Sequence, residues 1–156
     1  TVWDIREDGR IIGVTEELSA QDIYQLGKEI EPFVIAEGTR MGHVHLSVKN
    51  SREASTFYQE SLGLEDKFTI PHASWIASGA YHHHLAVNEW GGKNLASREQ
   101  GMSGLAYYVV EVENKVFLVN LFMQAQDRQG QLQWISSSEF SVTDKDGIVT
   151  RVRVEN

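Results

Sequence analysis

Histidine is concentrated in two short segments of this chain. Residues 42–48 carry two histidines and residues 81–87 carry three in a row, out of six in the whole sequence. Imidazole is the commonest metal ligand in proteins, and its pKa is near neutral. Two strand-like segments separated by a helix-sized connection could aim several imidazoles into one cleft. The pattern therefore predicts a metal site or a proton-transfer site in a small, β-rich enzyme fold. The five residues are His43, His45, His82, His83 and His84.

Composition narrows the class of protein. At 156 residues, with 41% hydrophobic and 23% charged residues, the chain suits one domain or two small repeats sharing an interface. A formal charge of −8 argues against nucleic-acid binding through a basic surface. No apolar run approaches the roughly 20 residues that span a bilayer, and no signal-peptide core is present, so we expect no membrane partner and a cytoplasmic location. Because cysteine is absent, any metal must sit on nitrogen and oxygen ligands.

Residues 1–40 differ from the remainder of the chain. A helix is predicted here, with Ser19 as its N-cap, Asp22 as a capping-box acid and Pro32 ending it. Its apolar stripe would be Ile23, Leu26 and Ile30. The segment could be a docking arm, but we favour a linker or the end of a preceding domain.

A regular pattern begins at residue 41. The segment 42–48 alternates polar and apolar side chains, as a half-buried strand does. Asn50 and Glu53 resemble a capping box that starts a helix, and Gly63 stands where a C-terminal glycine belongs. Further strands are expected near 65–70, 73–79 and 81–88. The order is β-α-β-β-β, and in a regular last strand His82 and His84 would point away from the side that His83 faces.

A second copy of this order follows at an offset of 64 residues, from 107 − 43, without a gap. Asn114 then aligns with Asn50, and a helix is expected at about 113–126. Strands are expected near 132–136, 138–143 and 148–154, with a turn at 144–147. The chain thus contains two modules, at about 41–90 and 104–154. The predicted fold class is α+β, with the paired β-α-β-β-β modules forming a curved-sheet cleft.

Three motifs give the chain a family resemblance. The run 42–48, the pair Phe57-Tyr58 and the segment 62–64 resemble the opening module of the vicinal oxygen chelate superfamily, which includes glyoxalase I, bleomycin-resistance proteins and extradiol dioxygenases. The turn at 144–147 is similar to the one before the last strand of such modules. The resemblance covers 41–154 and is nearest to the C-terminal half of catechol-2,3-dioxygenase-like proteins. It implies that 1–40 joins this half to an N-terminal pair of modules.

The resemblance also implies roles for individual residues. His43 matches the first-strand metal ligand of the extradiol enzymes, and His83 matches their active-site acid–base and would be the second ligand if a metal binds. Two further ligands of that family fall on Tyr107 and Arg151, which are poor replacements. We therefore expect this chain alone to bind divalent metal weakly or not at all. The implied substrate-binding residues are His45, Tyr107 and Trp90.

Three functions stay open at this stage. The first is an enzyme that uses Fe²⁺ or Mn²⁺, or else Zn²⁺, on the vicinal oxygens of a small aromatic or dicarbonyl substrate. The second is a metal-free module that binds a small molecule, and the third is a structural half whose active site lies in another domain. The chain could pair with itself or pack against a missing N-terminal domain. A strand histidine is more often structural than a ligand, His72 is expected in a loop, and Glu89 is the carboxylate nearest to the triplet.

Overall fold

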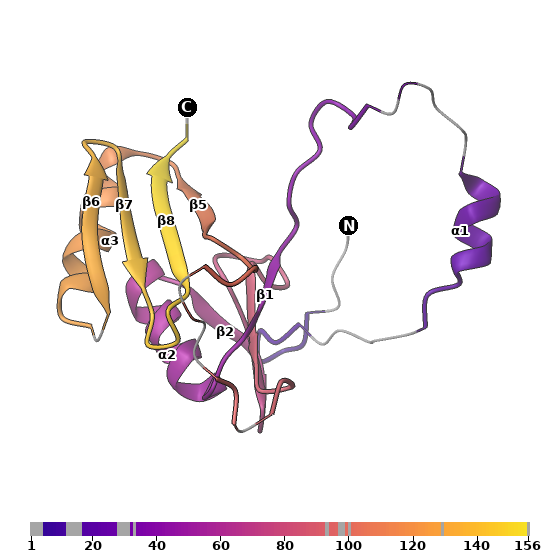
Figure 1. Cartoon of the computed structure of the whole chain (residues 1–156), viewed down its shortest axis with the longest axis horizontal. Coiled ribbons are helices and arrows are strands. Elements are labelled where there is room, and N and C mark those ends of the chain that lie inside the picture. The colour runs from indigo at the N-terminus through magenta and orange to yellow at the C-terminus, as the bar shows by residue number, and fades with distance from the viewer. Residues whose placement is uncertain are drawn as a thin grey trace.

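Eight strands and three helices make up the part of the chain that the computed structural model describes, which is residues 5–11, 17–27, 32, 34–92, 94–96, 99, 101–128 and 130–155. The strands form two separate four-stranded sheets, each mixed parallel and antiparallel. Figure 1 shows the two sheets at an angle to each other, with α2 and α3 beside them. The α+β class and its paired modules are as predicted.

The first sheet has the order β1-β4-β3-β2, in which β1 and β4 run parallel. Its helix α2 begins where the Asn50 side chain accepts from the backbone N–H groups of Arg52 and Glu53. The helix ends at Gly63, whose φ of 66° is left-handed and favours glycine. The elements are β1 (Val44–Ser47), α2 (Ser51–Leu62), β2 (Glu65–Ile70), β3 (Ala73–Ala77) and β4 (Leu85–Asn88).

The second sheet repeats the arrangement as β5-β8-β7-β6, with β5 and β8 parallel. Asn114 caps α3 by accepting from the backbone N–H of Phe117, as Asn50 caps α2. The predicted internal repeat is therefore a repeat of structure. The elements are β5 (Tyr108–Val112), α3 (Lys115–Gln126), β6 (Gln131–Ser136), β7 (Glu139–Thr143) and β8 (Val149–Val154).

One hydrophobic core joins the two modules through their helices. Leu46, Leu118 and Phe140 belong to the same buried cluster, so both sheets bury one face against α2 and α3. Tyr58 of α2, fully buried, donates a hydrogen bond of 2.7 Å to Oδ2 of Asp144 in the turn before β8. The opposite face of β1 is open: His45 and Ser47 are exposed there, while Leu46 between them is buried.

The histidine triplet lies outside a strand, which corrects the prediction of a strand at 81–88. β3 ends at Ala77 and β4 begins at Leu85, and Gly79 bends the connection with a φ of 60°. The backbone N–H of Ser78 donates to Nδ1 of His84, and this bond holds the bend closed. Strand alternation therefore does not govern the directions of the triplet side chains.

The N-terminal helix α1 (Ala20–Leu26) begins as predicted, with the Ser19 side chain accepting from the backbone N–H of Asp22. It ends at Gly27, earlier than the predicted end at Pro32; Ile30 lies outside the described residues. None of its residues is buried, and Figure 1 shows it apart from both sheets. The boundary at residue 40 stays a prediction. In the described ranges, no helix has the length and apolarity needed to cross a bilayer.

Candidate metal centre

Three imidazoles come together on the open side of the first sheet. His43 precedes β1, His45 lies in it, and His83 lies two residues before β4, its parallel neighbour. Their ring centroids are 5.1 Å apart for His43 and His45, 4.3 Å for His43 and His83, and 5.2 Å for His45 and His83. One ring nitrogen from each lies within 4.8 Å of the others. The structure thus brings His43 and His83 together, as predicted, and adds His45 to the group.

The nitrogen spacing is close to that of a real coordination sphere. Nε2 of His45 and Nε2 of His83 are 3.1 Å apart. With metal–nitrogen distances of about 2.0–2.1 Å, two neighbouring ligands of a tetrahedral or octahedral ion are about 2.8–3.4 Å apart. This pair already has that separation, whereas the remaining distances, up to 4.8 Å, require a small rotation of the exposed His43 ring. The group fits one divalent ion.

The surroundings favour the neutral form of two of these rings, those of His45 and His83. Burial, and then the nearby histidines His82, His43, His45 and His84, lower the pKa of His83 to about 3. Burial followed by the charge on His43 lowers the pKa of His45 as well. A neutral imidazole has a lone pair to give to a metal, while an imidazolium has none. Near neutral pH, His45 and His83 are therefore in the form that binds metal.

The other two members of the triplet have different surroundings. The His82 ring lies 4.2 Å from that of His83 and 5.4 Å from that of His43, so it packs against the group; the prediction that it points away is wrong. His84 uses Nδ1 to accept from the backbone of Ser78, and burial followed by the charge of Lys67 lowers its pKa. His84 thus takes part in the bend, and the His82 ring lies beside the group.

The residues predicted to contact substrate are in two places. Trp90 is 66% exposed, and its ring centroid is 6.5 Å from that of His45. Tyr107 lies in the second module, where the guanidinium of Arg151 sits 3.9 Å above its ring and also pairs with Glu139 at 3.5 Å. The substrate roles of His45, Trp90 and Tyr107 stay predictions. Tyr107 and Arg151 are the two residues that align with further metal ligands of the resembled family. In this structure they contact each other in a cation–π stack.

Glu89 is part of the helix start rather than of the histidine group. Its Oε1 accepts from both the backbone N–H and the hydroxyl of Ser51 at 2.8 Å, which secures the first turn of α2. Its Oε2 lies 3.2 Å from Nδ1 of His72. Both carboxylate oxygens are therefore occupied, and Glu89 is absent from the set of potential ligands found in the described part of the chain.

His45 is the member of the group that the sequence does not predict as a ligand. The sequence predicts it at the substrate, and in the structure its Nε2 lies 3.1 Å from Nε2 of His83. The signal was the spacing of His43 and His45, because residues two apart in an extended segment point to the same face of a sheet. What the sequence lacked was the register, which pairs His45 with Ala86 and so brings the strand level with the segment that carries His83.

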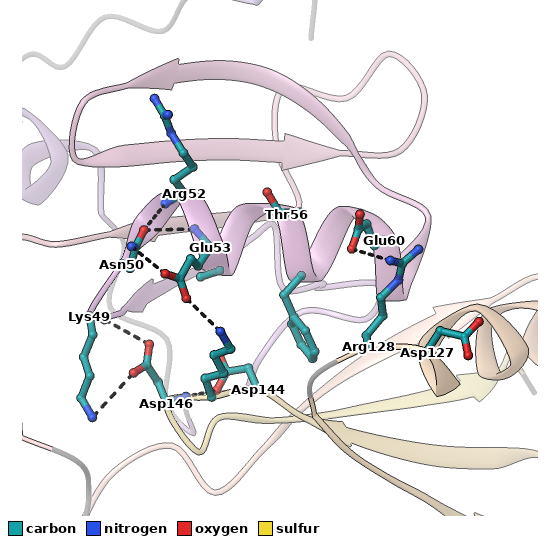
Figure 2. A pocket seen from close by; sticks show the side chains of 13 residues that line it. Lys49, Asn50, Arg52, Glu53, Thr56, Glu60, Asp127, Arg128, Asp144 and Asp146 are labelled. Carbon is teal, nitrogen blue, oxygen red and sulfur yellow. Dashed lines mark hydrogen bonds and ion pairs between the residues drawn. The ribbon is translucent and has the colours of Figure 1, made fainter.

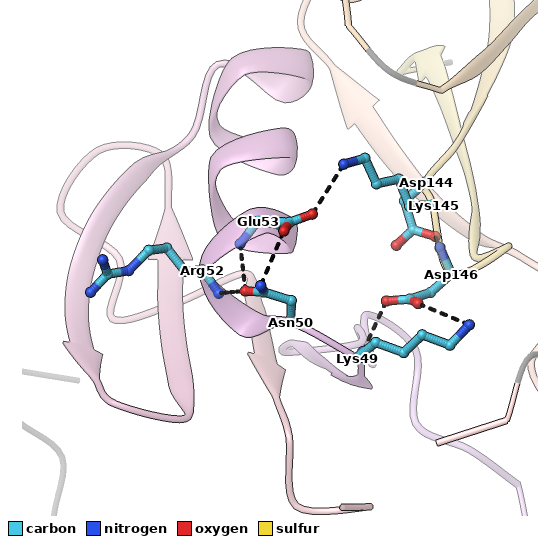
Figure 3. Close-up of polar contacts among 7 residues, drawn as sticks. All are labelled: Lys49, Asn50, Arg52, Glu53, Asp144, Lys145 and Asp146. Atoms are coloured by element: carbon cyan, nitrogen blue, oxygen red, sulfur yellow. Dashed lines mark hydrogen bonds and ion pairs between the residues drawn. The ribbon is translucent and has the colours of Figure 1, made fainter. Parts of the chain in front are cut away.

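A large groove of about 740 Å³ lies elsewhere, between α2 and the second module (Figure 2). Ion pairs cross it: Nζ of Lys145 is 3.0 Å from Oε2 of Glu53, and the Arg128 guanidinium is 3.1 Å from Oε2 of Glu60. At its end the backbone N–H of Lys49 donates to Asp146 at 3.0 Å (Figure 3). These contacts link the two modules across the groove. Among the described residues, no histidine lines the groove, so it is separate from the histidine group.

Comparisons with known proteins agree with this fold. No family model matches the chain. A catechol-2,3-dioxygenase of Bacillus subtilis (strain 168) is 28% identical over 112 residues, which are 70% of this chain and 39% of that protein. The chain thus spans well under two thirds of that relative's length.

Two solved structures share the architecture at low identity. A glyoxalase/dioxygenase from Nostoc punctiforme has a TM-score of 0.60 at 14% identity, over 80% of this chain and 97% of that one. A lactoylglutathione lyase from Agrobacterium tumefaciens has a TM-score of 0.54 at 14% identity, over 76% and 96%. The fold is therefore the paired β-α-β-β-β fold of the glyoxalases. The sequence match and these folds agree with the resemblance to the vicinal oxygen chelate superfamily that the motifs of the chain gave.

Proposed function

We propose that this chain binds one divalent metal ion through His43, His45 and His83 and acts there on two adjacent oxygens of a small aromatic or dicarbonyl substrate. The reaction class is that of an extradiol-type oxidoreductase, and the chain is the C-terminal domain of a catechol-2,3-dioxygenase-like enzyme. The observation that carries the proposal is the set of three ring nitrogens within 4.8 Å of one another. The name of the Bacillus relative supports the substrate class. A cytoplasmic location remains part of the same proposal.

The donor set indicates which ions suit the site. Imidazole nitrogens favour zinc, iron, copper and nickel, and iron oxygenases commonly add one carboxylate to two histidines. Here the group is three imidazoles. Imidazole binds a metal in its neutral form, so a bound ion would keep its full double positive charge. That charge favours an anionic pair of substrate oxygens. We propose Fe²⁺ or Mn²⁺ for dioxygenase chemistry, with Zn²⁺ as the competing ion.

The surrounding side chains supply the other functions. A bound divalent ion would act as a Lewis acid on the two substrate oxygens. Trp90, largely exposed beside His45, offers an aromatic face for an aromatic substrate. Since His83 belongs to the ligand set, we assign proton transfer to a ring nitrogen of His82, whose ring packs against His83. Burial and the surrounding histidines lower the pKa of His82, so it is neutral at pH 7 and can accept a proton from a substrate hydroxyl.

One observation favours a second function. Arg151 stacked on Tyr107 fills the place where the second module would offer ligands. A chain of this kind could be a structural half, or a metal-free module for small molecules, while another domain carries the reaction.

The direct test is an assay of ring cleavage. Purified chain loaded anaerobically with Fe²⁺ is mixed with catechol in air, and oxygen uptake and product absorbance are followed. We expect turnover that is lost in His45→Ala and retained in Ser47→Ala, a control at another exposed position of β1. Absence of turnover with Fe²⁺, Mn²⁺ and Zn²⁺ on both catechol and dicarbonyl substrates would favour the structural half.

A further inference from the structure

One place in the fold is packed differently in the two modules. Ser74 of β3 lies in the same row of the first sheet as Leu46 of β1, with one β4 residue between them. Phe140 of β7 lies in the same row of the second sheet as Val110 of β5. Leu46 and Val110 are equivalent, because 110 − 46 gives the 64-residue offset of the two modules. Ser74 and Phe140 therefore occupy the same place in their modules.

The second module fills this place with aromatic rings. Trp134 of β6 pairs with Phe140, and their ring centroids are 5.7 Å apart. The Trp134 ring also stacks on Phe122 of α3 at 4.4 Å. The equivalent pair in the first module is Thr69 and Ser74. Two small hydroxyl residues thus stand where the repeat has a tryptophan and a phenylalanine.

A pocket of about 210 Å³ lies at this place in the first module, between α2, β2 and β3. Its hydroxyl groups are connected: Oγ of Ser55 lies 2.7 Å from Oγ of Ser74 and accepts from Nε2 of Gln59 at 2.9 Å. The Thr69 hydroxyl lies 3.0 Å from Oγ of Ser74. Ser55 and Ser74 are buried, at 5% and 1% exposure. Burying hydroxyls is costly where apolar packing would serve, so this hydroxyl pocket suits a polar ligand.

A pairing irregularity aims the carboxylate of Asp66 at the hydroxyl pocket. Residues three apart in a regular strand point to opposite faces, but the register of β2 on β3 shifts between Asp66 and Phe68. Asp66 and Thr69 therefore share a face, and the Thr69 hydroxyl donates to Oδ1 of Asp66 at 2.6 Å. Oγ of Ser74 lies 3.4 Å from the same oxygen. Among the described residues nothing donates to Oδ2, so this oxygen is left for a ligand.

A positive charge also borders the hydroxyl pocket. Arg52, in the first turn of α2, is one of the residues that line it. Figure 3 shows its side chain extending away from Lys145 and Asp146, towards strands of the first sheet. In the described part of the chain, its guanidinium makes no ion pair and no hydrogen bond. A guanidinium and a carboxylate oxygen, both without a partner of their own, thus stand at one small polar pocket.

We propose that the hydroxyl pocket binds a small amino acid, with the carboxylate of the ligand on Arg52 and its ammonium group on Asp66. An anion alone would be repelled by Asp66, and a cation alone by Arg52. A zwitterion pairs with both charges, and charge-assisted hydrogen bonds are stronger than neutral ones. The volume of about 210 Å³ limits the ligand to one of the size of glycine or L-serine.

The first test is a titration of the ¹⁵N-labelled full chain, followed by NMR. Glycine and L-serine should each give saturable shifts at the backbone amides of Ser55 and Thr69. Glycinamide, which has no carboxylate, and N-acetylglycine, which has no ammonium group, should bind at least tenfold more weakly. Glycerol, which offers only hydroxyls, is the neutral probe. Absence of saturable shifts with both amino acids, or equal binding of glycinamide or glycerol, would overturn the proposal.

Two variants test the two charges. Arg52→Gln and Asp66→Asn should each weaken glycine binding by at least tenfold, and asparagine keeps an oxygen that can accept from Thr69. The matched controls are Arg128→Gln and Asp127→Asn, which change exposed residues of the groove between the modules and should leave binding unchanged. Binding that survives both pocket variants, or falls equally in the controls, would contradict the assignment.

A third variant gives the first module the packing of the second. Thr69 is exposed, so Thr69→Trp can place an indole over the hydroxyl pocket, and it should abolish glycine binding. Thr69→Ser keeps the hydroxyl and should retain binding, and both variants should keep the wild-type circular dichroism spectrum. His45 lies on the opposite face of the first sheet from Leu46 and Ser74, so metal titration of Thr69→Trp reports on the histidine group separately. Glycine binding that survives Thr69→Trp would overturn the proposal.

Discussion

The two modules have the same order of strands and the same asparagine caps, yet they differ at the positions that matter for chemistry. The first has His43 just before β1, and the second has Tyr107 just before β5. The first collects three imidazoles on its open face, while the second sets a guanidinium over a phenol ring. One fold thus supports two kinds of surface, because open-face side chains contribute little to the shared core.

The helices show the same division. α2 faces solvent with charged residues, and α3 with apolar ones. Each nevertheless buries its other face in the common core. This division agrees with the proposal that the first module, rather than the second, holds the metal and the substrate.

The largest predicted effect is on the free energy of unfolding, and it should differ between a substitution on the buried face of α3 and one on its exposed face. Leu118 is fully buried, so Leu118→Ala should destabilise the fold by about 2–5 kcal/mol through lost contacts and a cavity. Val116 is 72% exposed, and Val116→Ala should change stability by within about 0.5 kcal/mol. Urea unfolding of both variants measures this difference. Equal losses would mean that the exposed face of α3 is packed.

A smaller loss is expected from the buried bond between the modules. Tyr58→Phe leaves Oδ2 of the buried Asp144 without its donor, which should cost about 1–3 kcal/mol. The control is Tyr81→Phe, whose hydroxyl makes a longer bond of 3.4 Å to the Gly42 carbonyl in an exposed setting. Thermal unfolding of both proteins compares them. A Tyr58→Phe protein as stable as the Tyr81→Phe protein would show that this bond does not join the modules.

The same carboxyl should make stability depend on pH. Burial raises the pKa of Asp144 above its ordinary value, although Tyr58 and the backbone N–H of Ile148 oppose the shift. When the folded pKa is the higher one, the native state binds the proton more tightly, so stability falls as pH rises through that pKa. Asp144→Asn cannot ionise and can still accept from the backbone. The stability of wild type relative to this variant should therefore decrease from acid pH towards neutral. A constant or increasing difference would contradict the assignment.

The smallest effect belongs to the ion pairs across the groove. Lys145 and Glu53 are each more than half exposed, so Lys145→Ala should cost only about 0–1 kcal/mol and less in high salt. The control is Arg10→Ala, which removes a comparably exposed pair with Asp8 outside the two modules. A loss of stability well above that of the control, and unaffected by salt, would mean that the ion pairs across the groove do much to hold the two modules together.

Much of the fold was predictable because local signals agreed with each other. Asn50, Asn114 and Gly63 marked helix ends, and alternation marked most strands. The bend at 78–84 was not predictable, since it depends on the Ser78 backbone meeting the His84 ring. The helix after Ser19 was predicted too long: α1 ends at Leu26, and none of its residues is buried in the core.

The site was predictable only in part. His43 and His83 came from motif likeness, but the third imidazole needed the parallel register of β1 and β4. The hydrogen bonds that Glu89 accepts from Ser51 could not be predicted, because they depend on how α2 packs against the end of β4. Likewise, the exposure of α3 follows from which face the core selects. Such features arise from contacts between distant segments, which a single sequence does not display.

Isothermal titration with Zn²⁺, Mn²⁺ and anaerobic Fe²⁺ tests the central claim most directly. From the sequence, with two imidazoles counted, weak binding or none is expected; the three imidazoles of the structure predict one ion per chain. His43→Ala, His45→Ala and His83→Ala should each weaken binding by about tenfold or more. The matched control is His72→Ala, which removes the one histidine outside both clusters and should leave binding unchanged. Absence of binding, or binding that survives these three variants and disappears with His82 and His84, would contradict the proposed metal centre.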